Sequence, residues 1–360
     1  GEFLYWYPLD LRHTAIAHVS NHLSFFVFAH TAIFGKEHWP KAITLNDLLI
    51  SEGKKMSKSK GNVILLNSIS KTIGSDLFRL YCAHSADFGS VLDYKGKDAQ
   101  AGRKTFLKYV SAVRELNAVK ESKAESEQTS LSNWMVSKFE STLRDSTNAL
   151  EEYRLRDYIQ ASFFDLLNSY DYFSKRATSG EKAFVAKKIL GKWALLLCPV
   201  VPHACEELWR EVGGKTLASL TEWPKADLKS IDEDLESEQE LVQSVLFDCR
   251  KIIELVKFKP KNAVIFVASK TKFDKVKKAV SAAGEQSKVE SDDESVQKFV
   301  EKNFFQLKRG LTKIDERKVL GEAKEFLEKE LNLSIEINEE NASEPKSLKA
   351  MPLKPAVVLE

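Results

Sequence analysis

The chain has 360 residues, of which 43% are hydrophobic and 29% are charged, and its formal net charge is +2. These values are typical of a globular protein with room for two or three domains. They exclude a general excess of positive charge as the basis of nucleic-acid binding, so any such surface must come from local clusters of lysine and arginine. No uncharged apolar run is long enough to span a membrane, and the cysteines show neither a C-x-x-C pair nor zinc spacing. We therefore expect buried thiols in a cytoplasmic protein that has no membrane partner.

Residues 1–96 show an α/β pattern. The stretch at residues 21–34 is apolar on nearly all sides and predicts a buried helix. Residues 42–49 mix apolar and small polar side chains and predict a strand that leads into a lysine-rich loop. Beyond this loop, residues 68–73 and 76–83 predict two short helices.

The two short helices are bounded by residues with clear local preferences. Gly74 can end the first helix, because glycine accepts the left-handed conformation that often follows a last helical turn. Ser75 can cap the second helix with its hydroxyl group. Asp76 lies in the first turn, where the helix dipole favours an anion, and we expect it to pair with Arg79 or to cap within the same helix.

A lysine-rich loop, Glu-Gly-Lys-Lys-Met-Ser-Lys-Ser-Lys-Gly-Asn, occupies residues 52–62. Its cations alternate with hydroxyl groups and a glycine lies toward each end. Ammonium groups can therefore lie against a triphosphate while backbone N–H groups and serine hydroxyls donate to phosphate oxygens. The glycine spacing is not that of the usual P-loop. The loop predicts phosphate binding, and a plain solvated lysine-rich surface is the alternative.

Residues 97–235 predict a helix bundle, because several amphipathic helices follow one another with short connections. A polar stretch at residues 120–130 is suited to a linker. Phe164 and Trp209 recur at helical spacing with other apolar residues, and we expect both in the core of the bundle.

Residues 236–360 predict a small α+β module, with strands at residues 263–267 and 333–337. From residue 250 to residue 278 there are ten lysines and arginines against two acidic residues. Such a cluster can bind RNA phosphates, and a solvated lysine-rich surface is an equal alternative. The candidate RNA-binding residues are Lys257, Lys259, Lys261, Lys275 and Lys278.

Four blocks of sequence carry a family resemblance. They are Tyr-Trp-Tyr-Pro-Leu-Asp-Leu-Arg at 5–12 followed by Asn-His-Leu-Ser-Phe-Phe at 21–26, Lys-Met-Ser-Lys-Ser at 55–59, Gly-Ser-Asp-Leu-Phe-Arg-Leu-Tyr at 74–81, and Pro-Val-Val-Pro-His-Ala-Cys-Glu-Glu-Leu-Trp at 199–209. Together they resemble the C-terminal part of leucyl-tRNA synthetases of the archaeal and eukaryotic cytosolic type, which are class Ia aminoacyl-tRNA synthetases. The lysine block and the last block are shared with valyl and isoleucyl enzymes, so a synthetase of that type stays an alternative. The leucyl assignment rests on the first block and on Ala-Met-Pro-Leu-Lys-Pro-Ala at 350–356.

The resemblance implies three parts. Residues 1–96 are expected to be the end of a Rossmann-like α/β catalytic fold, residues 97–235 an all-α anticodon-binding bundle, and residues 236–360 a C-terminal α+β module that contacts tRNA. The intact protein is expected to be a monomer that joins leucine to tRNA(Leu), with ATP and Mg²⁺ as its nucleotide substrate. We expect no metal bound by this segment itself.

The resemblance also implies roles within the lysine loop, whose expected ATP-binding residues are Lys55, Met56, Ser57, Lys58 and Ser59. Lys55 and Lys58 are the expected catalytic residues, which neutralise the charge that develops on pyrophosphate as it leaves ATP. Ser57 and Ser59 are expected to shape the loop, and Met56 is expected to pack near the adenine.

Two alanines depart from the family pattern. Ala15 and Ala17 stand where the family has glycine and aspartate, and an alanine side chain cannot accept a hydrogen bond from a ribose hydroxyl. A non-catalytic tRNA-binding module from a degenerate synthetase paralogue therefore stays an alternative. The chain opens on Gly1 and shows neither a His-Ile-Gly-His signature nor an editing domain, so we expect a piece of a longer protein that does not aminoacylate tRNA alone. His18 and His22 lie four residues apart without a third ligand, and we expect helix-surface or capping roles for them.

Overall fold

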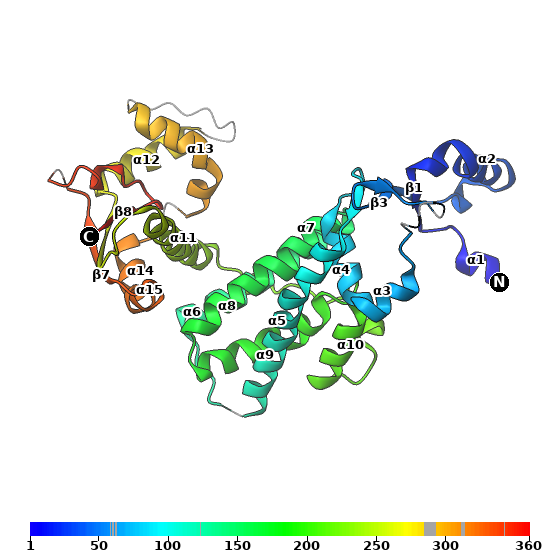
Figure 1. The fold of residues 1–360 in the computed structure, drawn as a ribbon, viewed down its shortest axis with the longest axis horizontal. Helices are drawn as coiled ribbons and strands as arrows, with labels where there is room; N and C mark the ends of the chain where they lie inside the picture. The colour runs from blue at the N-terminus through cyan, green and yellow to red at the C-terminus, as the bar shows by residue number, and fades with distance from the viewer. Residues whose placement is uncertain are drawn as a thin grey trace. The chain divides into compact units, whose positions relative to one another are not determined.

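The computed structural model describes residues 1–57, 59, 61, 63–122, 124–283, 293–310, 314–341 and 343–360 (Figure 1). The chain divides into two compact units. Unit 1 comprises residues 1–128 and 139–227, and unit 2 comprises residues 129–138 and 228–360. No helix among the described residues is long and apolar enough to cross a membrane.

Unit 1 begins with a short helix and a parallel strand pair. Helix α1 (Glu2–Trp6) precedes strand β1 (Leu11–Ala15), which pairs in parallel with β2 (Ala42–Asn46). Helix α2 (Ser24–Ile33) connects the two strands, as a parallel crossover requires, and follows the turns η1 (Ile16–His18) and η2 (Val19–Leu23). The predicted helix is confirmed, but the prediction that it is buried is wrong. Phe25 and Phe28 are 74% and 70% exposed, because no described element covers this face.

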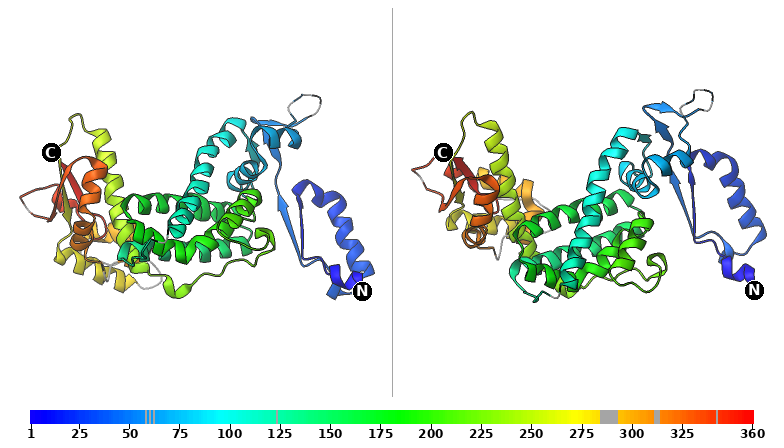
Figure 2. Two further views of the ribbon diagram at one scale, coloured as in Figure 1. Left: turned by 90° about the horizontal axis from the view of Figure 1, so that it is seen from below. Right: turned by 60° about the horizontal axis from the view of Figure 1, so that its bottom comes forward.

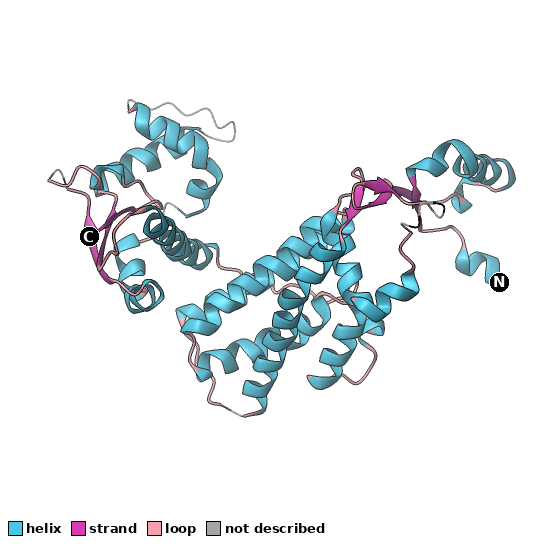
Figure 3. Cartoon of the chain, in the orientation of Figure 1, coloured by secondary structure: helices cyan, strands magenta, loops and turns pink. Residues whose placement is uncertain are grey.

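A second, three-stranded sheet follows in the order β4-β3-β5, with strands β3 (Leu49–Ser51), β4 (Lys54–Lys55) and β5 (Leu92–Tyr94). The single strand predicted over residues 42–49 is therefore wrong, since the chain changes sheet after β2. At this point the Asp47 N–H donates to the Phe88 carbonyl at 3.1 Å and the Leu48 N–H donates to the Asp47 carboxylate at 2.6 Å, so neither group extends the β2 ladder. Figure 3 shows the strands of this part of the chain as short magenta arrows.

Two short helices, α3 (Leu66–Thr72) and α4 (Ser75–Ser85), connect β4 to β5 and confirm the predicted pair. Gly74 separates them with φ of +92°, a conformation that favours glycine. The predicted capping role of Ser75 is wrong. Ser75 is the first residue of α4, and the N-cap position belongs to Gly74, which has no side chain to donate or accept.

A helix bundle makes up the rest of unit 1 (Figure 2) and is confirmed. Its elements are α5 (Gly96–Glu121), α6 (Ser130–Glu151, of which residues 139–151 belong to unit 1), α7 (Leu155–Ile159), the π-helical segment η5 (Gln160–Asp165), α8 (Leu166–Arg176), α9 (Ser179–Leu196), α10 (Pro202–Glu211) and the turn η6 (Ala218–Leu220). Fully buried aromatic side chains form its core, among them Tyr109, Phe139 and Trp193. The Tyr109 hydroxyl donates to the Trp193 carbonyl at 3.3 Å, so the largest core side chains also satisfy a buried polar group.

Unit 2 contains a three-stranded sheet with helices. The strand order is β7-β6-β8, in which β6 (Asn262–Val267) is parallel to β7 (Ser334–Glu339) and antiparallel to β8 (Ala356–Leu359). The helices and turns are η7 (Leu228–Ser230), α11 (Glu233–Leu255), α12 (Lys270–Ala283), α13 (Glu294–Gly310), α14 (Glu316–Glu322), α15 (Lys324–Leu331) and η8 (Ser347–Lys349). The two predicted strands are present. Ile335 is fully buried and Glu336 is exposed, which agrees with the alternation expected of β7.

Candidate functional site

The lysine loop begins on a tight hairpin. Strands β3 and β4 are antiparallel, with Ile50 opposite Lys55 and Ser51 opposite Lys54. The two turn residues, Glu52 and Gly53, have φ of +51° and +74°. Positive φ at both positions is typical of a type I′ hairpin turn, which favours glycine. The hairpin therefore fixes where the loop starts.

The loop residues that the structure describes are solvent-accessible. Lys55 and Ser59 are exposed, whereas Met56 and Ser57 are partly buried. The hydroxyl oxygens of Ser57 and Ser59 lie 2.8 Å apart and share a hydrogen bond, which agrees with a loop-shaping role for the two serines. Lys58, the second predicted catalytic residue, lies outside the described residues.

Strand β5 anchors the hairpin. The Gly53 N–H donates to the Asp93 carboxylate at 2.9 Å, and the Glu52 N–H donates to the Tyr94 carbonyl at 3.1 Å. On the opposite side of Asp93, its carbonyl accepts a hydrogen bond from the Tyr81 hydroxyl of α4 at 3.1 Å. The start of the lysine loop and the third sequence block are thus joined through β5 in one hydrogen-bonded network, in which Tyr81 of α4 holds the strand that anchors the loop.

The carboxyl ends of β1 and β2 form the edge where ligands usually bind in parallel α/β sheets. Ala17 is exposed there, and its carbonyl accepts a hydrogen bond from the Asn21 amide at 3.0 Å. The Thr14 hydroxyl shares a hydrogen bond of 2.6 Å with His18 Nδ1, and Arg12 Nη2 lies 3.1 Å from His22 Nε2. The two histidines have local polar partners, and the described residues contain no group of three metal-ligating side chains.

Asp76 and Arg79 join α4 to the helix bundle. The Asp76 carboxylate accepts hydrogen bonds from the backbone N–H groups of Ala204 at 2.7 Å and His203 at 3.4 Å. Arg79 donates to the carbonyls of Val200 at 2.8 Å and Pro199 at 2.9 Å. The expected pairing or capping within α4 is therefore wrong. Asp76 instead caps α10, whose own N-cap residue offers no side-chain oxygen.

Replacement of Asp76 by alanine is expected to lower the free energy of unfolding by roughly 1–2 kcal/mol, because the first turn of α10 then has no acceptor. Asparagine keeps one carbonyl oxygen at the same place, so Asp76→Asn is expected to lose less than half as much. Urea unfolding followed by circular dichroism measures both. Equal losses in the two variants would contradict the capping role.

Three of the five candidate RNA-binding lysines lie on one loop. Lys257, Lys259 and Lys261 are exposed between α11 and β6, and none of them forms an ion pair with a described residue. Phe258 lies between the first two and is 51% exposed. The Lys261 N–H donates to the Glu360 carbonyl at 2.8 Å, which ties the end of this loop to the last residue of the chain.

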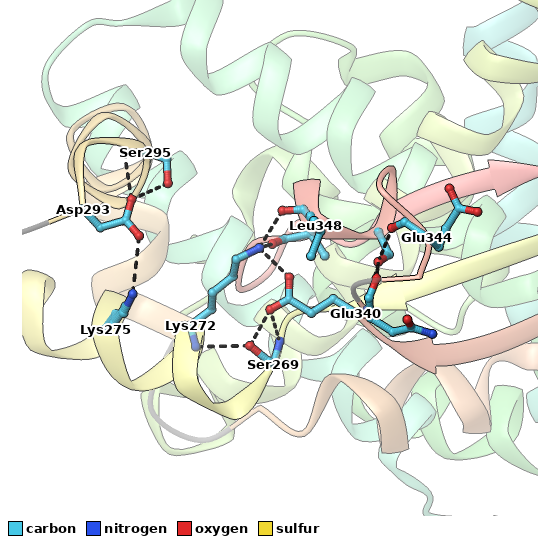
Figure 4. Close-up of polar contacts among 11 residues, drawn as sticks. Ser269, Lys272, Lys275, Asp293, Ser295, Glu340, Glu344 and Leu348 are labelled. Atoms are coloured by element: carbon cyan, nitrogen blue, oxygen red, sulfur yellow. Dashed lines mark hydrogen bonds and ion pairs between the residues drawn. The ribbon is translucent and has the colours of Figure 1, made fainter.

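The other two candidates, Lys275 and Lys278, lie on α12, whose lysines have mixed roles. Lys278 is exposed, but Lys275 Nζ lies 3.5 Å from the Asp293 carboxylate (Figure 4). Lys272 is a structural residue, because it pairs with Glu340 and donates to the Leu348 carbonyl at 2.6 Å. The ten cations of residues 250–278 therefore do not form one free basic surface.

Two family models match the chain. The model described as "tRNA synthetases class I (M)" matches residues 14–109, and the model described as "Anticodon-binding domain of tRNA ligase" matches residues 132–268. The first range contains the lysine loop with its anchor, and the second contains most of the helix bundle. The chain therefore combines part of a class I tRNA synthetase catalytic-type domain with a helical anticodon-binding domain.

Leucine–tRNA ligases are similar to the chain over its whole length. The chain is 38% identical to that of Staphylothermus marinus over 99% of its residues, 36% identical to that of Pyrococcus horikoshii and 33% identical to that of Methanococcus maripaludis over all of them. It spans 38% of the length of each of these relatives. The chain is thus a homologue of a portion of leucine–tRNA ligases, and the family resemblance predicted from four sequence blocks is confirmed.

A solved structure shares the fold. The LeuRS–tRNA–LeuAMS ternary complex from Agrobacterium radiobacter K84 matches with a TM-score of 0.54 and 19% identity. The match covers 62% of this chain and 29% of that chain. At this identity the similarity concerns the fold alone.

Proposed function

We propose that the chain supplies the lysine loop and the tRNA-binding parts of a leucine–tRNA ligase, which joins leucine to tRNA(Leu) with ATP. The observation that carries this proposal is the hairpin that presents the loop from β3 and β4 and is anchored to Asp93 and Tyr94, in a chain homologous to those ligases. Mg²⁺ enters with ATP as part of the substrate. We expect the intact enzyme to be monomeric and cytoplasmic.

The proposed chemistry is in-line attack of the leucine carboxylate on the α-phosphate of ATP, with pyrophosphate as the leaving group. Negative charge grows on pyrophosphate in the transition state, so cations close to it lower the barrier. Lys55 and Lys58 are proposed to supply these charges, with Met56 against the adenine and Ser57 and Ser59 shaping the loop. Because the hairpin fixes the start of the loop, the ammonium groups act over a short and defined reach.

A degenerate, non-catalytic tRNA-binding paralogue is the second candidate. The observation in its favour lies just after the carboxyl end of β1. Ala17 has no polar side chain, and its carbonyl already accepts a hydrogen bond from the Asn21 amide. If this candidate is correct, replacing Ala15 by glycine and Ala17 by aspartate restores a ribose acceptor and raises activity.

A chimera decides between the two candidates. In it, this chain replaces the aligned 38% of the Staphylothermus marinus relative, and leucine-dependent pyrophosphate exchange is measured. The proposal expects exchange within about tenfold of the parent relative, since the catalytic groups are kept. Exchange that appears only after Ala15→Gly and Ala17→Asp supports the paralogue. A folded chimera, judged by circular dichroism, that stays inactive with both changes overturns the catalytic proposal.

The exposed loop between α11 and β6 is the proposed tRNA contact of unit 2. Each lysine that neutralises a phosphate releases counterions, so binding weakens steeply with salt. Changing Lys257, Lys259 and Lys261 to glutamine is expected to lower the salt-dependence slope by roughly one for each phosphate that is no longer neutralised. Changing Lys275 and Lys278 is expected to do less, because Lys275 already pairs with Asp293.

Fluorescence anisotropy of the full chain with a tRNA(Leu) transcript, at several salt concentrations, measures these slopes. A control variant carries glutamine at Lys298, Lys318 and Lys329, three lysines on other helices of unit 2. Its slope is expected to match the wild type. An unchanged slope in the loop variant would place the tRNA contacts of this chain elsewhere.

A further inference from the structure

Unit 1 contains a cavity of about 500 Å³ apart from the lysine loop. It lies where one face of α4, the start of α5 and the π-helical segment η5 meet, and no residue of the loop lines it. Its volume is within the range of pockets that hold small molecules and cofactors. A π-helical segment in a wall is a further sign, because such irregular turns occur frequently at functional sites.

The interior of the cavity suits a flat ring. Leu77 and Leu80 from α4 form an apolar floor, and the half-buried Phe164 of η5 forms a wall. The ring centroids of Phe164 and His84 lie 4.6 Å apart, so the aromatic surface continues from one ring to the other. Gly102 of α5 keeps the space open, since a Cβ atom there would meet only Leu77 Cδ1, at 3.5 Å.

Polar groups are placed for an anion and for a hydrogen-bonding ring. His84 Nδ1 is buried and bonds to no group in the described part of the chain. Burial and the nearby Arg156 lower the pKa of His84, so its imidazole is neutral at pH 7 and can donate or accept according to its tautomer. Lys95 and Arg156 supply cations to the lining, and Asp93 and Asp98 supply carboxylates. Arg156 Nη1 also lies 3.9 Å from the Asp87 carboxylate, a long ion pair that a phosphate would replace.

We propose that this cavity binds one nucleotide. Its base lies against Phe164 and the apolar side chains of Leu77 and Leu80, beside the neutral imidazole of His84. An exocyclic amino group donates to Asp98, and the phosphate pairs with Lys95 and Arg156. The nucleotide is either a free mononucleotide or a single nucleotide turned out of a bound RNA, since both present the same chemistry. Only the RNA source rests on the proposed function.

Isothermal titration of the full chain with AMP tests the free-nucleotide source. Phe164→Leu removes the stacking surface and Arg156→Gln removes a phosphate partner, and each is expected to weaken binding about tenfold. Gly102→Leu fills the cavity and is expected to abolish binding, and circular dichroism confirms that this variant is folded before it is titrated. The matched control is Arg154→Gln, because Arg154 pairs with Glu152 and Asp157 and does not line the cavity.

The same variants in titrations with a tRNA(Leu) transcript test the RNA source. Weaker AMP binding in the cavity variants establishes the free nucleotide, and unchanged AMP but weaker tRNA binding establishes the RNA-borne one. If Gly102→Leu and Arg156→Gln alter neither, or if neither probe binds, the cavity is no nucleotide site. Lys71→Ala changes a residue that is exposed on α3 and lies outside both the lysine loop and the lining of the cavity, and it is expected to leave both titrations unchanged. Pyrophosphate exchange in the chimera tests the lysine loop separately, so a failure of the loop is distinguished from a failure of the cavity.

Discussion

Alanine in place of Lys58 is expected to slow adenylate formation about 100- to 1000-fold in the chimera that carries this chain. The reason is the removal of one charge-assisted interaction with pyrophosphate, of roughly 3–4 kcal/mol, made in the transition state. Lys55→Ala is expected to slow adenylate formation as well, because Lys55 is the last residue of β4 and the hairpin places it at the start of the loop. Leucine-dependent pyrophosphate exchange measures both.

The split between kcat and KM separates catalysis from binding in this experiment. An interaction made mainly in the transition state raises kcat, so its removal lowers kcat, whereas removal of an interaction made equally to bound ATP raises KM alone. Lys71→Ala is the matched control, since Lys71 is exposed on α3, outside the loop. An unchanged kcat in Lys58→Ala, with the control also unchanged, would remove the lysine loop from the proposed mechanism.

Local patterns in the sequence were sufficient to predict the bundle helices and to locate the lysine loop. The bundle helices were predictable because apolar residues such as Tyr109 and Val113 recur at helical spacing and are buried in the structure. The lysine loop was recognisable because cations alternate with hydroxyl groups between two glycines. These features depend only on neighbouring residues, so no tertiary information was needed. The hairpin before the loop was not predicted, because glutamate rarely adopts the positive φ that Glu52 has in the turn.

Partners distant in the sequence were not predictable. Asp76 and Ala204 are 128 positions apart, and nothing near Asp76 indicates that its carboxylate caps another helix. The available signal for this contact lies at the other helix. The Val-Val-Pro sequence before α10 provides no capping side chain, so α10 needs an acceptor from elsewhere in the chain, such as the aspartate of Asp-Leu-Phe-Arg. Lys275 illustrates the same limit, because composition alone does not reveal its ion pair with Asp293.

The burial of individual apolar side chains was the property least well predicted from the sequence, as Phe164 and α2 show. Helical spacing placed Phe164 in the bundle core, but it is only half buried because the π-helical turn shifts it onto the wall of a cavity. The apolar composition of α2 indicated a covered helix, but Phe25 and Phe28 are exposed among the described residues. An apolar composition indicates that a helix face is more stable when it is covered. Whether the face is buried depends on which other elements the fold packs against it.

Glutamine in place of Glu316 is expected to make unit 2 more stable at pH 8 and to change little at pH 5. Glu316 is 3% exposed, its Oε1 accepts from the Leu353 N–H, and its Oε2 has no hydrogen-bond partner in the described residues. Burial raises the pKa of this carboxyl from 4.5 to about 7, although the nearby N–H groups of Leu353 and Ala268 lower it, and Asp315 adds a smaller increase. A buried carboxylate without full hydrogen bonding is costly, and protonation removes the cost.

The raised pKa makes the contribution of Glu316 to stability depend on pH. The folded state holds the proton more tightly than the unfolded state, so the contribution of Glu316 to stability is fully present below pH 4.5 and is lost as the pH rises to about 7. The loss amounts to about 3 kcal/mol in total. Because glutamine does not titrate, Glu316→Gln is expected to gain about 2–3 kcal/mol over the wild type at pH 8.

Urea unfolding, followed by pulsed hydrogen exchange in peptides that span β6 and β7, measures the stability of unit 2 at each pH. The difference in stability between variant and wild type removes the effect of all other titrating groups, because both proteins share them. A difference between variant and wild type that stays constant from pH 5 to pH 8 would show that Glu316 is ionised throughout, and that the Leu353 turn is held by a charged acceptor.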